Sequence, residues 1–240
     1  MENKPLEGFT FLFGLAEALG ALGLILTAIW LGSYRGGFTW TSNPKLEFNW
    51  HPLLMMMGMI FLYANGILVY RSFRNSRKRK LKIAHAFINA MAFIFTIIGL
   101  QAVFDSHNLA SPSPIPNMYS LHSWLGLASV ILFALQWVFG LLSFLYPTLS
   151  APLRATYYPI HVFFGINAFV CASASALLGL TEKAIFNVSD YSQFSSEGLL
   201  VNCIGVTIVI FTSLVVHLVT EVKFKRHPLP EDEMLLTSNE

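Results

Sequence analysis

Six stretches of the chain are long and apolar enough to cross a bilayer, and this pattern restricts the possible folds more than any other feature. They cover about 9–32, 50–71, 83–104, 121–145, 157–180 and 199–221. A membrane-spanning helix needs about 20 apolar residues. Only 12% of the 240 residues are charged, against about 25% in a soluble domain. The sequence therefore predicts an all-α, polytopic membrane protein with one domain over residues 1–240 and a core over about 9–221.

The distribution of Lys and Arg predicts the orientation of these spans. The segment RSFRNSRKRKLK, which begins at Arg71, holds seven basic residues and no acidic one. Short cytoplasmic loops are enriched in Lys and Arg. Placing this loop in the cytoplasm puts both termini and the 146–156 loop on the same side, with 12 of the 15 Lys and Arg residues. The short N-terminus and the tail 222–240 are therefore predicted to be cytoplasmic.

Two short motifs bear on the orientation of the chain and on the membrane in which it resides. Asn187-Val188-Ser189 is a glycosylation sequon and falls on the non-cytoplasmic side. The segment EDEMLL, from Glu231, matches an acidic dileucine sorting signal. The sequon agrees with the predicted orientation, and the sorting signal favours an endosomal, lysosomal or secretory-vesicle membrane over the plasma membrane.

Four histidines lie at the ends of four spans. His51 and His122 open spans that start on the outer side, whereas His85 and His161 open spans that start on the cytoplasmic side. A single histidine at the membrane interface is more often a hydrogen-bonding partner of a neighbouring helix than a metal ligand. Histidines paired at two depths suit axial ligation of two haem irons, since neutral imidazole is a common haem ligand. With both axial positions closed, such a haem transfers electrons and does not bind oxygen.

Small residues follow each histidine along the face of its own helix, at offsets that stay on one side. In the fourth and fifth spans this stripe ends in a glycine 18 residues after the histidine: Gly140 after His122, and Gly179 after His161. Eighteen residues of helix rise about 27 Å. We expect each glycine to give room for the haem at the opposite end.

Five segments carry a family resemblance. FNWHPLLMMMGMIFLYANGILVYR, KIAHAFINAMAF, NMYSLHSWLG, LRATYYPIHVFFG and LLGLTEKAIF resemble the eukaryotic cytochrome b561 family. The likeness runs from about Tyr34 to Arg226 and is close to the animal branch with vesicle, duodenal and lysosomal members. It implies six helices, of which helices 2–5 form a four-helix bundle that holds two haem b groups. It also implies a homodimeric, ascorbate-dependent transmembrane oxidoreductase whose acceptor is a ferric chelate or monodehydroascorbate.

The resemblance also assigns roles to individual residues. It implies that His51 and His122 hold the outer haem, and that His85 and His161 hold the inner one. It implies further haem contacts by Arg71, Asn117, Met118, Tyr119, Ser120, Glu182 and Lys225. The residues themselves agree in part: Arg71 lies at the inner rim, where a guanidinium suits a haem propionate. The free backbone amides of 117–120, before the fourth span, suit an outer propionate.

Both substrate ends have candidate residues. Lys78, Lys82 and His85 share one helical face if the third helix begins early, and Arg154 approaches them from the next cytoplasmic loop; the resemblance makes Lys78, Lys82 and Arg154 the ascorbate site. Most of the basic loop is explained equally well by topology and anionic lipid. On the outer side the resemblance makes His107, with Asn108, a contact for the acceptor, a metal or outer ascorbate. Ferric iron prefers oxygen ligands, so Asp105 and Glu197 are possible assistants.

Two other functions remain open on the sequence alone. The first is a transporter that binds divalent metal ions directly through its histidines. The second is a haem b anchor subunit that exchanges electrons with quinone. The intramembrane Glu17 and the late His217 are assigned no role, and we expect the lipid bilayer but no nucleic acid as a partner.

Overall fold

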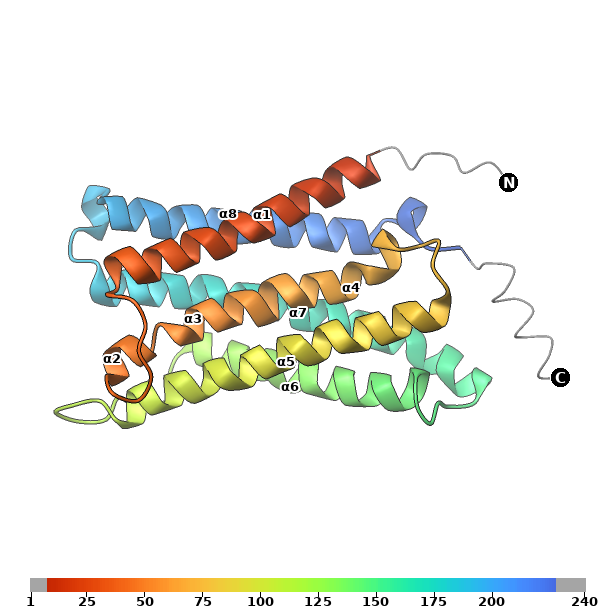
Figure 1. Cartoon of the computed structure of the whole chain (residues 1–240), viewed down its shortest axis with the longest axis horizontal. Coiled ribbons are helices and arrows are strands. Elements are labelled where there is room, and N and C mark those ends of the chain that lie inside the picture. The colour runs from red at the N-terminus through yellow and green to blue at the C-terminus, as the bar shows by residue number, and fades with distance from the viewer. Residues whose placement is uncertain (1–7, 228–240) are drawn as a thin grey trace.

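The computed structural model describes residues 8–227, which contain the six predicted spans as helices (Figure 1). The long helices are α1 Phe9–Ile29 with its π-helical extension η1 Trp30–Tyr34; the second span, α3 Trp50–Met55, η2 Met56–Leu62 and α4 Tyr63–Ser72; α5 Lys78–Asn108; α6 Leu121–Phe144; α7 Ala151–Asn187; and α8 Ser196–Thr220. Shorter elements are α2 Pro44–Glu47, η3 Tyr191–Gln193 and η4 Val222–Phe224. Residues 8–227 contain no β-strand. The predicted all-α membrane fold is confirmed, while the EDEMLL signal lies outside the described residues.

Two helices extend well beyond the apolar stretches that predicted them. α5 has 31 residues and α7 has 37, about 46 and 55 Å at 1.5 Å per residue. Their extra turns are mostly polar. Hydropathy identifies only the part of a helix that lies in lipid, whereas the helix itself continues as long as its backbone hydrogen bonds do. Since α5 starts at Lys78, the condition that aligns Lys78, Lys82 and His85 on one face is met.

The long helices run side by side along the long axis of the molecule (Figure 1). α1 packs on α8, α6 packs on α7, and the second span packs on α5. The connections 73–77 and 145–150 lie at one end, together with η4. The connections 35–43, 109–120 and 188–195 lie at the other (Figure 1). We call these the inner and outer ends, following the orientation that the basic loop predicts.

Small residues let the second span approach its neighbours closely. A Cβ at Gly58 would lie 2.7 Å from the carbonyl oxygen of Ala92 on α5, and one at Gly66 would lie 2.5 Å from the amide of Asn89. Gly58 belongs to the π-helical turn η2, whose wider turn changes the face that α4 presents relative to α3. Such contacts between small residues are typical of helix packing in lipid.

A buried aromatic cluster fills the middle of the bundle. The ring of Tyr63 lies 4.5 Å from that of Phe133 and 5.7 Å from that of Phe169, between centroids. The Tyr63 hydroxyl donates to the carbonyl oxygen of Gly165 at 2.7 Å. Helices α4, α6 and α7 are thereby joined at mid-depth, which holds the histidine-bearing ends of the bundle in register.

Candidate functional site

The outer pair consists of His51 on α3 and His122 on α6. Their ring centroids lie 6.1 Å apart with the planes at 87°. Nδ1 of His51 is 3.1 Å from the carbonyl oxygen of Gly99, and Nδ1 of His122 is 2.7 Å from that of Ser175. A carbonyl only accepts, so each Nδ1 carries the proton and each Nε2 keeps its lone pair.

The inner pair consists of His85 on α5 and His161 on α7. Their ring centroids lie 6.2 Å apart with the planes at 73°. Nδ1 of His85 donates to the carbonyl oxygen of Gly66 at 2.7 Å, which again leaves Nε2 free to bind a metal. Nδ1 of His161 is buried and has no hydrogen-bond partner among residues 8–227. The His161 ring instead packs against Phe144 and Tyr157, with ring centroids at 5.4 and 6.0 Å.

The glycines at the ends of the two stripes lie against the opposite histidines. A Cβ on Gly179 would lie 2.7 Å from Cε1 of His122, and a Cβ on Gly140 would lie 2.9 Å from Cε1 of His161. Each glycine therefore lies beside the histidine of the opposite end of the bundle, and the expectation that it gives room for the haem there stays a prediction. Both glycines make room for the imidazole ring of the other helix, because α6 and α7 run antiparallel and in close contact.

A cavity of about 800 Å³ surrounds the outer pair. Its lining includes both outer histidines and six of the other predicted residues: His107, Asn117, Met118, Tyr119, Ser120 and Glu182. Ser120 caps α6 and its hydroxyl donates to the Glu182 carboxylate at 3.2 Å, which gives that acid a partner at the cavity wall. The structure thus gathers around one space residues that are distant in sequence.

The predicted acceptor residues form a small polar cluster at this cavity. Nδ1 of His107 lies 2.9 Å from Oδ1 of Asn117, and the Asn117 amide donates to Oδ1 of Asn108 at 2.8 Å. Of the proposed assistants, Asp105 accepts from Gln101. The carboxylate of Glu197 is paired with Arg35 and accepts from the Trp30 indole, so it joins α8 to the end of α1.

Sequence reasoning missed three residues of the outer cavity: Lys45, Phe48 and Lys183. The ammonium of Lys183 lies 3.8 Å from the centroid of the Phe48 ring, a cation–π contact. The same ring stacks on His107, 6.4 Å away at 9°. Phe48 lies in the turn between α2 and α3 and precedes His51 by three residues, and its carbonyl accepts from the His51 N–H, so its closeness in sequence to the histidine was a usable signal. The contact with Lys183, 135 residues further along the chain, was not.

At the inner rim, one of the two predicted haem contacts already makes hydrogen bonds within the protein. The Arg71 guanidinium donates to the carbonyl oxygens of Val219 and Glu221, at the end of α8. Lys225 is exposed at the end of η4. Arg71 therefore ties the second span to α8, and its free N–H groups remain available to an anion.

The three predicted ascorbate residues come together. Lys78 and Lys82 lie one turn apart on α5, and both Lys78 and Arg154 are close enough to Lys82 to repel its charge. Nζ of Lys82 donates to the carbonyl oxygen of Phe144 at 2.8 Å, while Arg154 donates to the Leu149 carbonyl at 2.5 Å. Both cations are thus anchored at the inner end, near the aromatic rings that flank His161.

A family model described as eukaryotic cytochrome b561 matches residues 50–187, more than half of the 240 residues. The chain belongs to this family. The matched segment contains all four paired histidines, and family membership implies a haem b cofactor.

Curated relatives cover most of the chain. The transmembrane ascorbate-dependent reductase of Sus scrofa is 44% identical over 223 residues, which span 92% of this chain and 86% of that protein. The protein of the same name from Homo sapiens is 41% identical over 221 residues, with the same coverage. The plasma membrane ascorbate-dependent reductase of Xenopus tropicalis is 44% identical over 228 residues, 92% of this chain and 79% of that protein.

The histidine pairs fit the iron of the family's cofactor. An imidazole nitrogen binds a transition metal at about 2.0 Å and its ring centre lies roughly 1.1 Å further out, so two imidazoles on opposite sides of one iron have centres about 6.2 Å apart. The observed distances are 6.1 Å for the outer pair and 6.2 Å for the inner pair. Each pair therefore has the spacing that two axial ligands of one haem require.

Proposed function

We propose that this cytochrome b561 carries electrons across the membrane from cytoplasmic ascorbate, through two haem b groups, to a non-cytoplasmic acceptor. The observation that carries the proposal is that two pairs of histidines, one at each end of the bundle, have the spacing of axial ligands. In this assignment His51 and His122 hold the outer haem, and His85 and His161 hold the inner one. Haem iron supplies a reversible one-electron step.

The protein's own contribution begins with the imidazoles. Backbone carbonyls of Gly99, Ser175 and Gly66 fix three of the four rings in the tautomer whose Nε2 binds metal. Two imidazoles per iron close both axial positions, which favours electron transfer over oxygen binding. The two tiers are separated by about 27 Å along α6, the rise between His122 and the glycine that touches His161.

The donor end is assigned to Lys78, Lys82 and Arg154. Ascorbate is a monoanion at neutral pH, so three cations held together at the inner rim provide the complementary charge. We assign Arg71 to an inner propionate as well, because a guanidinium that already donates to two carbonyls still has N–H groups to offer. Lys225 is the further cation at this rim.

The acceptor end is assigned to the outer cavity. Asn117, Met118, Tyr119, Ser120 and Glu182 line it as the haem contacts. His107 and Asn108 stand at its polar edge, where the acceptor, a ferric chelate or monodehydroascorbate, receives the electron. Lys45 and Lys183 add positive charge there, which suits an anionic acceptor.

The remaining features of the proposal concern assembly and location. We propose a homodimer in an endosomal, lysosomal or secretory-vesicle membrane, with the basic loop and both termini in the cytoplasm. The seven basic residues between Arg71 and Lys82 lie toward this end, and the enrichment of Lys and Arg in cytoplasmic loops supports the orientation. Asn187, in the sequon, then lies at the outer end of α7.

The decisive assay uses proteoliposomes that enclose an impermeant ferric chelate. Ascorbate added to the side that carries the basic loop should reduce the trapped iron, and the purified protein should show reducible b-type absorption bands. A colourless protein that binds zinc at its histidines would instead support a metal transporter. Reduction by quinol but not by ascorbate would support a quinone-linked anchor subunit.

The geometry already favours haem over bare metal ions. Each tier offers two imidazoles, which is the number that haem iron needs in addition to its porphyrin, whereas a structural zinc site takes four protein ligands. Within residues 8–227 no group of three or more His, Cys, Asp or Glu side chains has the arrangement of a metal site.

A further inference from the structure

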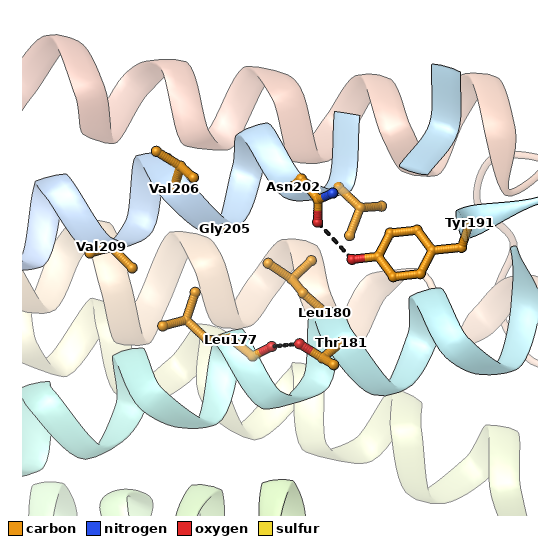
Figure 2. Close-up of a pocket in the computed structure, with 9 residues that line it drawn as sticks. Leu177, Leu180, Thr181, Tyr191, Asn202, Gly205, Val206 and Val209 are labelled. Atoms are coloured by element: carbon orange, nitrogen blue, oxygen red, sulfur yellow. Dashed lines mark hydrogen bonds between the residues drawn. The ribbon is translucent and has the colours of Figure 1, made fainter. Parts of the chain in front are cut away.

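A second hollow lies on the outside of the bundle, between α7 and α8, and the proposed electron transfer does not use it. Its volume is about 360 Å³, near the small end of the roughly 300–1,000 Å³ range of ligand pockets. Figure 2 shows its walls: Leu177 and Leu180 come from α7, Val206 and Val209 from α8, and Tyr191 from the connection between them. Val206 and Val209 are 59% and 48% exposed, so the hollow opens toward lipid.

The polar groups of this groove are gathered toward one end. The Tyr191 hydroxyl donates to Oδ1 of Asn202 at 2.6 Å (Figure 2). Because Asn202 accepts through its oxygen, its amide N–H groups remain donors for an oxygen of a ligand. Thr181 donates to the Leu177 carbonyl of its own helix and is satisfied there. All nine lining residues are uncharged.

The dimensions match a short, rigid ring system. Asn202 and Val209 are seven residues apart on α8, about 10 Å along its axis. Between them Gly205 forms part of the floor, where a Cβ would meet only Leu177, at 3.7 Å, so a flat body can approach the backbone. Asn202 lies about 9 Å from the outer end of α8, close to the boundary between head groups and hydrocarbon.

We propose that this groove binds a sterol from the non-cytoplasmic leaflet, with the sterol hydroxyl at Asn202 and its fused rings along Gly205 and Val206. A phospholipid head carries an ionised phosphate, and the groove offers no cation to pair with it. A benzoquinone carries oxygens at both ends of its ring, whereas this groove has its free donor at one end. A single neutral hydroxyl on a flat apolar body fits both the polarity and the shape.

The groove shares a wall with the outer cavity. Leu180 lines both hollows. A bound sterol would therefore contact one of the α7 side chains that line the outer cavity. The proposed sterol site does not depend on the proposed electron transfer, because its test measures sterol binding alone.

Photolabelling tests the proposal directly. The full chain, in nanodiscs of neutral phosphatidylcholine, is irradiated with a photoreactive cholesterol analogue and mapped by mass spectrometry. We expect labelled peptides from α7 and α8 around Leu177 and Val206, and competition by unlabelled cholesterol. Gly205→Leu should lower this labelling about tenfold by filling the floor, and Asn202→Leu about fivefold by removing one hydrogen bond.

The matched control is Gly14→Leu. Gly14 is an exposed glycine on α1 with nothing within 4 Å of its would-be Cβ, so the same change there should leave labelling intact. Retained absorption bands and a single chromatographic peak establish that each variant is folded. Equal labelling of Gly205→Leu and the natural sequence would overturn the proposal.

Two further results would also overturn it. Equal labelling of the groove by a photoreactive phosphatidylcholine acyl chain, without displacement by cholesterol, would make it ordinary lipid-facing surface. Efficient crosslinking of two copies through Val206→Cys, in a Cys203→Ser background that removes the exposed neighbouring thiol, would make it a subunit interface.

Discussion

The two ends of the bundle carry nearly identical histidine pairs in very different surroundings. The outer pair borders a cavity of about 800 Å³ that reaches the 109–120 connection. The inner pair is flanked by aromatic rings: Tyr70 lies 5.7 Å from His85, and Phe144 lies 5.4 Å from His161. The common spacing matches what one metal ion requires of two imidazoles. The differing surroundings suggest that each end is adapted to its own redox partner.

The pairs differ also in how their rings are held. His122 is bonded through Nδ1 to the Ser175 carbonyl, with the Ser175 hydroxyl at 3.1 Å, whereas Nδ1 of His161 has no partner among the described residues. The orientation of His161 therefore depends on packing against Phe144, Tyr157 and Gly140. Hydrogen bonds therefore orient His122, whereas packing orients His161.

Removing one ligand from each pair should have the largest effect. His51→Ala and His85→Ala should each halve the haem content per chain, because each removes one of two axial bonds from a different tier. Haem per protein, measured by the pyridine haemochrome method, and redox titration of the remaining component are the readouts. If both variants kept two haems, the assignment of the pairs would be wrong.

Filling the space beside each ring should come next. Gly179→Leu should displace His122 and remove most of the outer haem, and Gly140→Leu should do the same to His161 and the inner haem. The control is Gly14→Leu on α1, where nothing lies within 4 Å of the would-be Cβ. We expect Gly140→Leu to be the more damaging, since His161 lacks a hydrogen bond at Nδ1. Equal loss from the control would show a general effect of bulk on helix packing.

Removing cations from the inner end should weaken only the reaction with the electron donor, ascorbate. The double change Lys82→Ala and Arg154→Ala should raise the ascorbate concentration for half-maximal reduction about tenfold, as expected for the loss of roughly 1.4 kcal/mol of charge attraction. Both haems should remain. Arg79→Ala with Lys80→Ala removes equal charge from exposed positions of the same helix and should change little. Loss of a haem in the first variant would mean that Lys82 and Arg154 retain the cofactor.

The smallest effect is expected at the outer end. Lys183→Met keeps the length of a side chain that lies over Phe48 but removes its charge. We expect reduction of an anionic ferric chelate to slow about threefold and to become less sensitive to salt, because electrostatic steering weakens. Reduction of the haems by ascorbate should be unchanged. A slower donor step instead would contradict the separation of the two ends.

Much of the fold was predictable because lipid imposes strict demands. A backbone in hydrocarbon must satisfy its own hydrogen bonds, so each apolar stretch had to be a helix. The interior faces of α5 also followed from counting: Asn89, Ala92, Thr96 and Gly99 are buried as the stripe after His85 predicted. The π-helical turn η2 was not predictable, since its sequence, MMGMIFL, has the composition of any apolar helix.

The site was predictable in kind but not in detail. Counting 18 residues identified Gly140 and Gly179, yet it could not say what each glycine faces on another helix. Lys183 was given no role from the sequence, because its contact with Phe48 joins two segments far apart in the chain. Such contacts depend on how helices are rotated about their axes.

The sequence by itself determined that six helices cross the membrane and that four histidines lie at two depths, because hydropathy and helical rise are properties of each segment alone. The tertiary structure decided which histidines face one another, at 6.1 and 6.2 Å, and what surrounds each pair. Rotation and tilt of a helix in lipid are set by packing against its neighbours. That information is carried by many weak contacts and by no single segment.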